Sequence, residues 1–132
     1  MIVLDASATV ELLFRSTLGA QVAERIGSPA VSLHAPHLLS VEVTQVLRRL
    51  VRREQLSAAR AAEAVVDLGD LDIARYEHEP LLVRMWELRP NLTAYDAAYV
   101  ALAELLDAPL LTTDVRLARS PGARCTFEVL TG

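Results

Sequence analysis

The chain contains 132 residues, of which 52% are hydrophobic and 23% charged, so we expect one folded domain spanning residues 1–132 and exclude a disordered protein. All 13 basic residues are arginine, which excludes mechanisms that need a lysine, such as a P-loop or a Schiff base. The formal net charge of −4 argues against a simple nucleic-acid coat, unless a metal ion offsets clustered acids.

The first half of the chain predicts strands and helices in alternation, beginning with a short apolar strand that runs directly into an acid. Thr17 and Ser57 are expected to cap two of the helices, and Gly27 and Gly69 to end them. Pro36 is expected at the start of the longest helix. The expected elements are a strand at 2–4, helices at 7–14 and 18–26, a strand at 31–33, and helices at 37–53 and 58–68.

The second half continues the alternation around its most apolar helix, which Thr93 is expected to cap. Pro80 fits the first turn of the helix before it. The expected elements are a strand at 71–76, helices at 81–88 and 94–106, a strand at 110–111, a helical turn at 115–119 and a strand at 126–130. This alternation predicts an α/β fold, a three-layer α/β/α sandwich with a short parallel central sheet.

We expect a cytoplasmic protein with no secretion signal and no membrane span. The first apolar run is interrupted by Asp5 and Glu11, which is not the pattern of a signal peptide. The longest uncharged run in the second half, 97–103, is far shorter than the ~20 residues that cross a bilayer. The single cysteine, Cys125, excludes an internal disulfide and fits a reducing compartment.

Four acids stand out by their positions along the chain. Asp5 ends the first strand, and Asp114 follows a later one. Asp96 lies in the first turn of the most apolar helix, and Glu42 lies near the start of the long helix, at the margin of its apolar stripe. The carboxyl ends of the strands are where ligands bind in open α/β sheets. Since helix N-termini meet this same edge, we expect the four carboxylates to lie close together.

A cluster built from carboxylates predicts a hard cation, because Mg²⁺ and Mn²⁺ prefer oxygen ligands. The four acids account for the whole net charge of −4, so the remaining surface is neutral on balance. Zinc is not expected, because only one cysteine is present and the three histidines are scattered. Loop or surface positions are expected for all three: His34, His37 and His78.

Each acid also has a purely structural interpretation, and these alternatives stay open at the level of sequence. Asp5 and Asp114 could be helix N-caps, worth ~1 kcal/mol each. Asp96 could be a first-turn acid favoured by the helix dipole. Glu42 could pair with an arginine, with Arg49 in reach on the same helix.

The motifs around the acids follow one another in a specific order. The segments are Ile2-Val3-Leu4-Asp5-Ala6-Ser7, Ser40-Val41-Glu42-Val43, Tyr95-Asp96-Ala97-Ala98-Tyr99-Val100-Ala101-Leu102-Ala103 and Leu111-Thr112-Thr113-Asp114-Val115-Arg116-Leu117-Ala118. In this order and spacing the chain resembles the PIN domain, in particular the VapC-type ribonuclease toxins of type II toxin–antitoxin systems. The resemblance covers essentially the whole chain.

The resemblance implies an endoribonuclease that cleaves RNA phosphodiesters with a metal-activated water. It implies a quartet that is both catalytic and a Mg²⁺ or Mn²⁺ site: Asp5, Glu42, Asp96 and Asp114. Ser7 and Thr112 would add hydroxyls beside that site. Some PIN domains carry a further acid two residues after the fourth, whereas this chain has Arg116 there, which favours a contact with substrate phosphate.

The resemblance also implies partners: an RNA substrate, a small DNA-binding antitoxin and a second copy in a homodimer, with no membrane. A short apolar segment could form a dimer face or pack in the core: Leu81, Leu82, Met85 and Trp86. Four arginines near the end of the long helix have three open interpretations, namely a solvated helix end, an RNA-backbone contact or pairing with an acidic partner. They are Arg48, Arg49, Arg52 and Arg53.

Two other functions compete with the ribonuclease. Asp5 could be the nucleophile of an aspartyl-phosphate phosphotransfer protein. However, Ser7 stands where the phosphatase motif has a second acid, and both classes of such proteins rely on a lysine that this chain lacks. A non-enzymatic PIN-like interaction module with a degenerate site is the other alternative, and the complete quartet argues against it.

Overall fold

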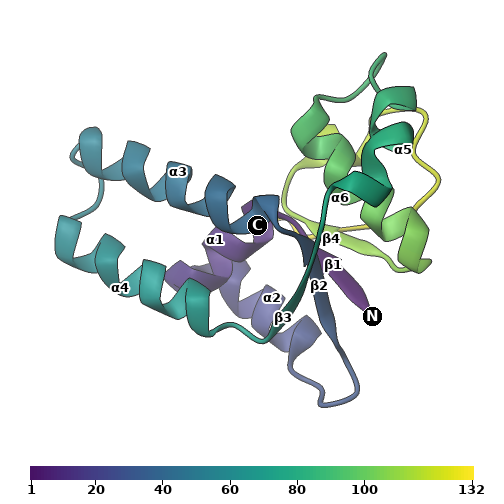
Figure 1. The fold of residues 1–132 in the computed structure, drawn as a ribbon. Helices are drawn as coiled ribbons and strands as arrows, with labels where there is room; N and C mark the ends of the chain where they lie inside the picture. Colours follow the sequence, from purple (N-terminus) through teal and green to yellow (C-terminus); the bar gives the residue numbers. More distant parts are fainter.

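The computed structural model describes residues 1–132, which form five strands and the helices around them (Figure 1). The strands are β1 (Ile2–Leu4), β2 (Leu33–Pro36), β3 (Ile73–Tyr76), β4 (Leu110–Thr112) and β5 (Phe127–Val129). The helices are α1 (Ala6–Phe14), α2 (Thr17–Ile26), α3 (Leu38–Arg52), α4 (Ala58–Asp70), the 3₁₀ helix η1 (Glu79–Leu81), α5 (Leu82–Glu87), α6 (Ala94–Leu106) and α7 (Val115–Ala118).

The strands form one parallel sheet in the order β3-β2-β1-β4-β5. β1 is central, with Val3 opposite Leu110 of β4 and opposite His34 of β2. The chain builds the sheet outward from β1 in one direction through β2 and β3, and in the other through β4 and β5. The boundary between β1 and β4 is therefore the topological switch point, where α/β sheets form their ligand crevice.

Helices cover both faces of the sheet. Figure 1 shows α1 and α2 on one side of the strands and α5 and α6 on the other, while α3 and α4 extend from the sheet as an antiparallel pair. α6 packs against β1, β2 and β4. The predicted three-layer sandwich with a parallel central sheet is confirmed. No helix has the length and hydrophobicity needed to cross a bilayer.

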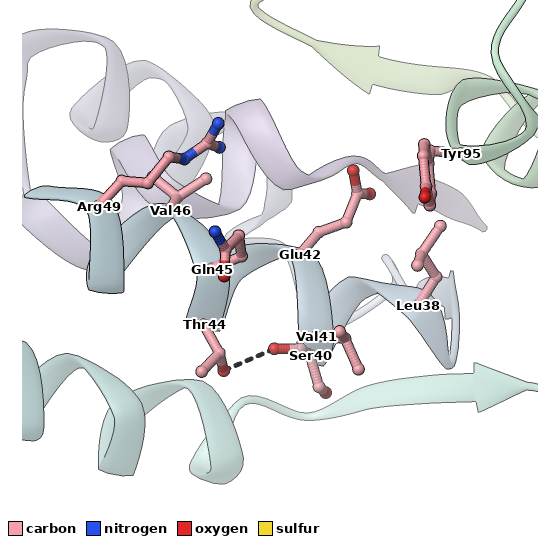
Figure 2. Close-up of a pocket in the computed structure, with 9 residues that line it drawn as sticks. All are labelled: Leu38, Ser40, Val41, Glu42, Thr44, Gln45, Val46, Arg49 and Tyr95. Atoms are coloured by element: carbon pink, nitrogen blue, oxygen red, sulfur yellow. Dashed lines mark hydrogen bonds between the residues drawn. The ribbon is translucent and has the colours of Figure 1, made fainter.

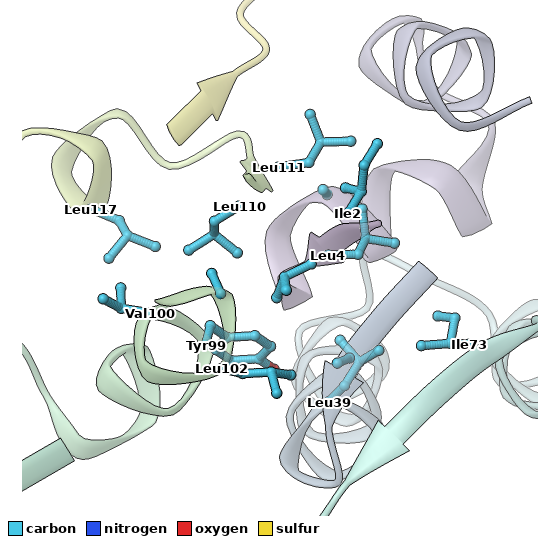
Figure 3. Packing of buried hydrophobic residues seen from close by; sticks show 14 of the residues in the cluster. Ile2, Leu4, Leu39, Ile73, Tyr99, Val100, Leu102, Leu110, Leu111 and Leu117 are labelled. Atoms are coloured by element: carbon cyan, nitrogen blue, oxygen red, sulfur yellow. The ribbon is translucent and has the colours of Figure 1, made fainter. Parts of the chain in front are cut away.

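The core extends over both faces of the sheet, and β1 and α6 contribute its continuous buried runs, which explains why both segments are apolar without alternation (Figure 3). All three residues of β1 are buried, as expected for the middle strand of a parallel sheet covered on both faces. The run from Ala97 to Ala103 of α6 is buried on every side. This burial fixes the two elements that carry Asp5 and Asp96.

The predicted bounds of the strand at 31–33 are wrong, because β2 spans Leu33–Pro36. Pro36 ends this strand instead of starting the helix. Its missing N–H falls at the last strand position, where a ladder bond is not required. The shift buries His34, whose ring contacts the Tyr76 hydroxyl at 2.6 Å and the Ser32 hydroxyl at 2.8 Å. The prediction of a loop or surface position is therefore wrong for His34, whereas His37 is exposed and His78 lies in a loop.

Two helix boundaries also differ from the prediction. α2 is capped by Ser16 and not by Thr17, since the Ser16 hydroxyl accepts a hydrogen bond from the Gly19 N–H at 2.9 Å. Gly19 is required there because an added Cβ would lie 2.0 Å from the Glu11 carbonyl oxygen. α4 continues through Gly69 to Asp70, whereas its predicted cap is confirmed.

Candidate active site

Asp5 is the most firmly held of the four acids. β1 carries it to the carboxyl edge of the sheet, where only 5% of its surface is exposed. Its Oδ1 accepts hydrogen bonds from the Ser7 hydroxyl at 2.7 Å and the Ala8 N–H at 3.0 Å, and its Oδ2 accepts one from the Thr112 hydroxyl at 2.5 Å. The Ala8 bond caps α1, so the N-cap interpretation of Asp5 is correct. Because both oxygens are engaged, Asp5 is poorly suited to attack a phosphorus atom.

The hydroxyls of Ser7 and Thr112 tie the ends of β1 and β4 together, at a distance of 3.2 Å from each other. Ser7 Oγ accepts a hydrogen bond from the Thr113 N–H at 3.0 Å, and Thr112 Oγ1 accepts one from the Asp114 N–H at 2.9 Å. Since both hydroxyls also donate to Asp5, they connect the first acid to the chain around the fourth.

Asp114 and Asp96 both stand at helix starts. Asp114 caps α7 by accepting hydrogen bonds from the N–H groups of Arg116 at 2.9 Å and Leu117 at 3.2 Å, so its N-cap interpretation is also correct. Asp96 lies in the first turn of α6, and its N–H donates to the capping hydroxyl of Thr93 at 3.2 Å. The partial positive charge at helix N-termini lowers the free-energy cost of placing acids there.

Glu42 extends from α3, and in Figure 2 its side chain points to the same side of that helix as Arg49. The residue is half-buried, and its Oε1 is buried without a hydrogen-bond partner. Glu42 takes part in no ion pair, so the alternative that it pairs with an arginine is wrong. A buried carboxylate oxygen without a partner is costly, and this favours a cation or a proton at the position.

The charges of the four acids act on one another. Burial raises the pKa of Asp5 to about 6 despite the hydrogen bonds it accepts, and the charge of Asp114 raises it further. Burial also raises the pKa of Asp96, and again the charge of Asp114 adds to the effect. Burial raises the pKa of Glu42, the neighbouring Tyr99 hydroxyl partly offsets this, and the charge of Asp96 adds to the rise. These interactions join the four acids into one electrostatic group.

The four carboxylates nevertheless do not converge on one point. No three acidic, histidine or cysteine side chains lie close enough together to surround a metal ion. Repulsion between like charges favours this spacing, and helix capping holds Asp5 and Asp114 where they are. The fold therefore gathers the quartet at one edge of the sheet without closing it into a ligand sphere.

Tyr99 is the site residue that the sequence interpretation missed. Its ring is buried, and its hydroxyl lacks a hydrogen-bond partner of ordinary geometry. Burial and the neighbouring Glu42 carboxylate raise the pKa of Tyr99, with smaller contributions from the charges of Asp5 and Asp96. Its hydroxyl thus lies among three of the acids. The spacing of three residues from Asp96 was the available signal, because it puts both side chains on one face of α6.

An open cleft of about 660 Å³ lies between α3 and the start of α6, and Glu42 is the one acid of the quartet that lines it (Figure 2). Glu42, Arg49 and Tyr95 are among its lining residues. Arg116 is exposed on α7, and its charge lowers the pKa of Asp96. Unpaired arginines therefore flank the acidic group, one on α3 and one on α7.

A family model of the PIN domain matches residues 2–122, a range that includes all four acids. The chain belongs to the PIN domain family. The resemblance seen in its motifs is thereby confirmed.

Curated relatives place this PIN domain in the VapC group. Ribonuclease VapC9 of Mycobacterium tuberculosis is 42% identical over an alignment of 132 positions that covers 98% of each chain. Ribonuclease VapC1 of the same species is 43% identical over 129 residues, which is 97% of this chain and 96% of the relative. Among solved structures, VapBC2 from Rickettsia felis bound to a DNA fragment from their promoter contains a chain that matches with a TM-score of 0.69 and 14% identity, covering 98% of both chains. That match shows a common fold.

The acidic group of this PIN domain fits a hard divalent cation by its chemistry. Every donor in it is an oxygen, which suits Mg²⁺ or Mn²⁺ and not zinc. A cation would stabilise the ionised forms of Asp5 and Asp96, whose pKa values burial has raised. It would also provide a partner for the orphaned Oε1 of Glu42.

Proposed function

We propose that this PIN domain is an endoribonuclease and the toxin of a VapC-type toxin–antitoxin pair. The observation that carries the proposal is the electrostatic grouping of four acids at the switch point of the sheet, in a chain 42% identical to a curated VapC ribonuclease over nearly its full length. The proposed catalytic and metal-binding residues are Asp5, Glu42, Asp96 and Asp114.

The quartet is proposed to hold Mg²⁺ or Mn²⁺. When bound, such a cation supplies positive charge that activates water and offsets the charge of the scissile phosphate. Asp5 and Asp114 serve as fixed points of the site, since hydrogen bonds hold their carboxylates. Glu42 has a raised pKa, so Glu42 is our candidate to accept the proton of the attacking water, through the carboxylate oxygen that does not bind the cation.

Substrate and partners follow from the same assignment. RNA is the proposed substrate, and we propose that Arg116 contacts phosphate beside Asp96. The proposed protein partner is a small DNA-binding antitoxin, which the name of the Rickettsia felis VapBC2 complex supports by analogy. A homodimer is proposed through the exposed apolar face of α5, because Leu82 and Trp86 are 53% and 68% exposed, whereas Leu81 belongs to the core. The cytoplasm, where RNA is the accessible substrate, is the proposed compartment.

The test is RNA cleavage by protein purified free of any partner, with structured cellular RNA and with Mg²⁺, Mn²⁺ or a chelator. We expect cleavage with either metal and none with the chelator. Asp5→Asn and Asp96→Asn should each lower the cleavage rate by roughly 100-fold or more, as expected when a charged group that stabilises the transition state is removed. Asp70→Asn is the matched control, because Asp70 is an exposed acid at the end of α4, near the opposite edge of the sheet.

Cleavage that survives chelation, or that persists in both asparagine variants, would contradict the metal-quartet mechanism. Absence of cleavage together with absence of divalent-ion binding by calorimetry would favour the non-enzymatic interaction module instead.

A further inference from the structure

Three arginines near the end of α3 form an exposed cationic surface that no acid neutralises. Arg49, Arg52 and Arg53 are exposed, and together they line a small cleft of about 280 Å³. None of them takes part in an ion pair, whereas Arg25 and Arg84 each bind a glutamate. A free guanidinium is a strong donor for phosphate.

This surface is continuous with the cleft that contains Glu42. Arg49 lines both the arginine cleft and the larger cleft that contains Glu42. Glu42 and Arg49 are spaced by seven residues, which places them on one face of α3, and Arg53 follows directly after the last residue of that helix, Arg52. At 1.5 Å per residue, the distance along the helix from Glu42 to Arg52 is roughly 15 Å. Figure 2 shows the Glu42 and Arg49 side chains directed to the same side of the helix.

Tyr95 lies at the other end of the larger cleft. Its ring is 60% exposed, although it directly precedes Asp96 and lies in the first turn of a helix whose other aromatic residue, Tyr99, is buried. An exposed ring beside a phosphate-cleaving site is suited to stack on an unpaired base. The face of a base is not available for such stacking inside a duplex.

We propose that the α3 face is a track for single-stranded RNA, in which Tyr95 stacks on a base next to the cut and Arg49, Arg52 and Arg53 bind the phosphates that follow. The track rests on the proposed ribonuclease function and adds to it the path of the substrate strand and the residues that bind it. Its length of roughly 15 Å corresponds to about four nucleotides at the ~3.4 Å rise of a stacked strand. Arg48 lies outside the track, because it lines neither the arginine cleft nor the larger cleft, whereas Arg52 lines both the arginine cleft and the separate groove between α3 and α4.

The test measures binding of a fluorescently labelled, unstructured 20-nucleotide RNA by anisotropy over a range of salt concentrations. The Asp5→Asn protein with Mg²⁺ is the parent, so that cleavage does not interfere. For single strands the logarithm of affinity falls with the logarithm of salt concentration by about 0.7 for each phosphate contact. Replacing the three track arginines with glutamine should therefore make the slope shallower by about 2. Arg48→Gln should leave the slope of the parent unchanged.

Base stacking is tested in the same assay. Tyr95→Ala should weaken binding of the single strand by about tenfold or more, while Tyr95→Phe should retain it, because only the ring is needed. A duplex of the same sequence should bind more weakly than the single strand and should not respond to Tyr95→Ala.

An unchanged salt slope in the triple variant, or equal binding of duplex and single strand, would overturn the track. An unchanged slope would also leave the arginines as contacts for an acidic protein partner. Failure of the parent to bind any RNA would overturn the track as well. Cleavage by the wild-type protein is scored separately, so loss of the track does not count against the ribonuclease function.

Discussion

At the scale of single residues, Asp5 shows how the fold sets stability against function. Three hydrogen bonds orient its carboxylate, yet burial still raises the pKa of Asp5 to about 6 from an ordinary value of 3.8. This difference corresponds to about 3 kcal/mol that opposes the ionised side chain in the folded protein. Such a penalty is typical of a residue kept for chemistry and not for stability.

The shifted pKa of Asp5 predicts how the stability of the protein without metal depends on pH. As the pH falls from 7 to 5, the folded state takes up a proton that the unfolded state does not yet bind, so the free energy of unfolding rises. For Asp5 alone the gain is about 1.4 kcal/mol, and Asp96 and Glu42 shift in the same direction. Urea unfolding in a chelating buffer measures it.

In the Asp5→Asn variant the rise in the free energy of unfolding between pH 7 and 5 should be smaller, because the largest of the three carboxylate contributions is removed. Glu104 is paired with Arg84, and its pKa is lowered. Its contribution to the free energy of unfolding is therefore lost only as the pH falls below the ordinary pKa of a glutamate. A wild-type stability that is flat or falls between pH 7 and 5 would contradict the pKa assignment.

At the scale of secondary-structure elements, α6 carries more of the site than any other helix. Its buried run packs against β1, β2 and β4, which fixes its position relative to Asp5. Its first turn supplies Asp96, and the same face supplies Tyr99 one turn later. The N-cap therefore matters for two reasons: it stabilises the helix, and it orients the backbone that carries an acid.

Removal of this cap should affect both stability and activity. Thr93→Ala should lower the free energy of unfolding by about 1 kcal/mol and reduce RNA cleavage, because the Asp96 N–H loses its acceptor. Ser57→Ala is the matched control, since Ser57 caps α4 in the same way through the Arg60 N–H at 3.1 Å. Chemical denaturation and cleavage assays of both variants measure the two effects.

Equal losses of activity in the Thr93 and Ser57 variants would show that activity follows global stability. In that case the cap of α6 would have no separate role in orienting Asp96.

At the scale of the whole molecule, the sheet order brings distant segments to one edge of the sheet. An ion pair holds α5 against α6. Arg84 of α5 binds Glu104 of α6 at 2.6 Å and also donates to the Gly122 carbonyl at 2.8 Å. α5 is thereby held on the body of the protein, yet its outer face remains apolar. Val83 and Trp86 are 77% and 68% exposed there. Exposed apolar clusters of this kind are typical of protein interfaces.

The exposed face of α5 leads to a prediction about the oligomeric state. The purified protein should have the mass of a dimer by light scattering, and Trp86→Glu should shift it to the monomer. Val66→Glu is the control, because Val66 is 61% exposed on α4. A dimer that survives Trp86→Glu would place the interface elsewhere.

The sequence by itself determined the α/β alternation, the ends of most elements and the positions of the four acids relative to those ends. Local chemistry explains this success. Capping residues such as Thr93 and Ser57 act within one turn of a helix, and short apolar strands such as the one before Asp5 occur where a parallel sheet is covered on both faces. The spacing of the acids along the chain was sufficient to expect them at one edge.

Only the tertiary structure decided features that depend on contacts between distant segments. The register of β2, which moved Pro36 into the strand and buried His34, depends on pairing with β1 and β3. Glu42 and Arg49 share one face of α3 two turns apart, and the packing of α6 puts Tyr99 beside Glu42. The same packing leaves Arg49 unpaired in the cleft, because side chains that are neighbours on a helix still turn toward whatever charges and surfaces the rest of the fold supplies.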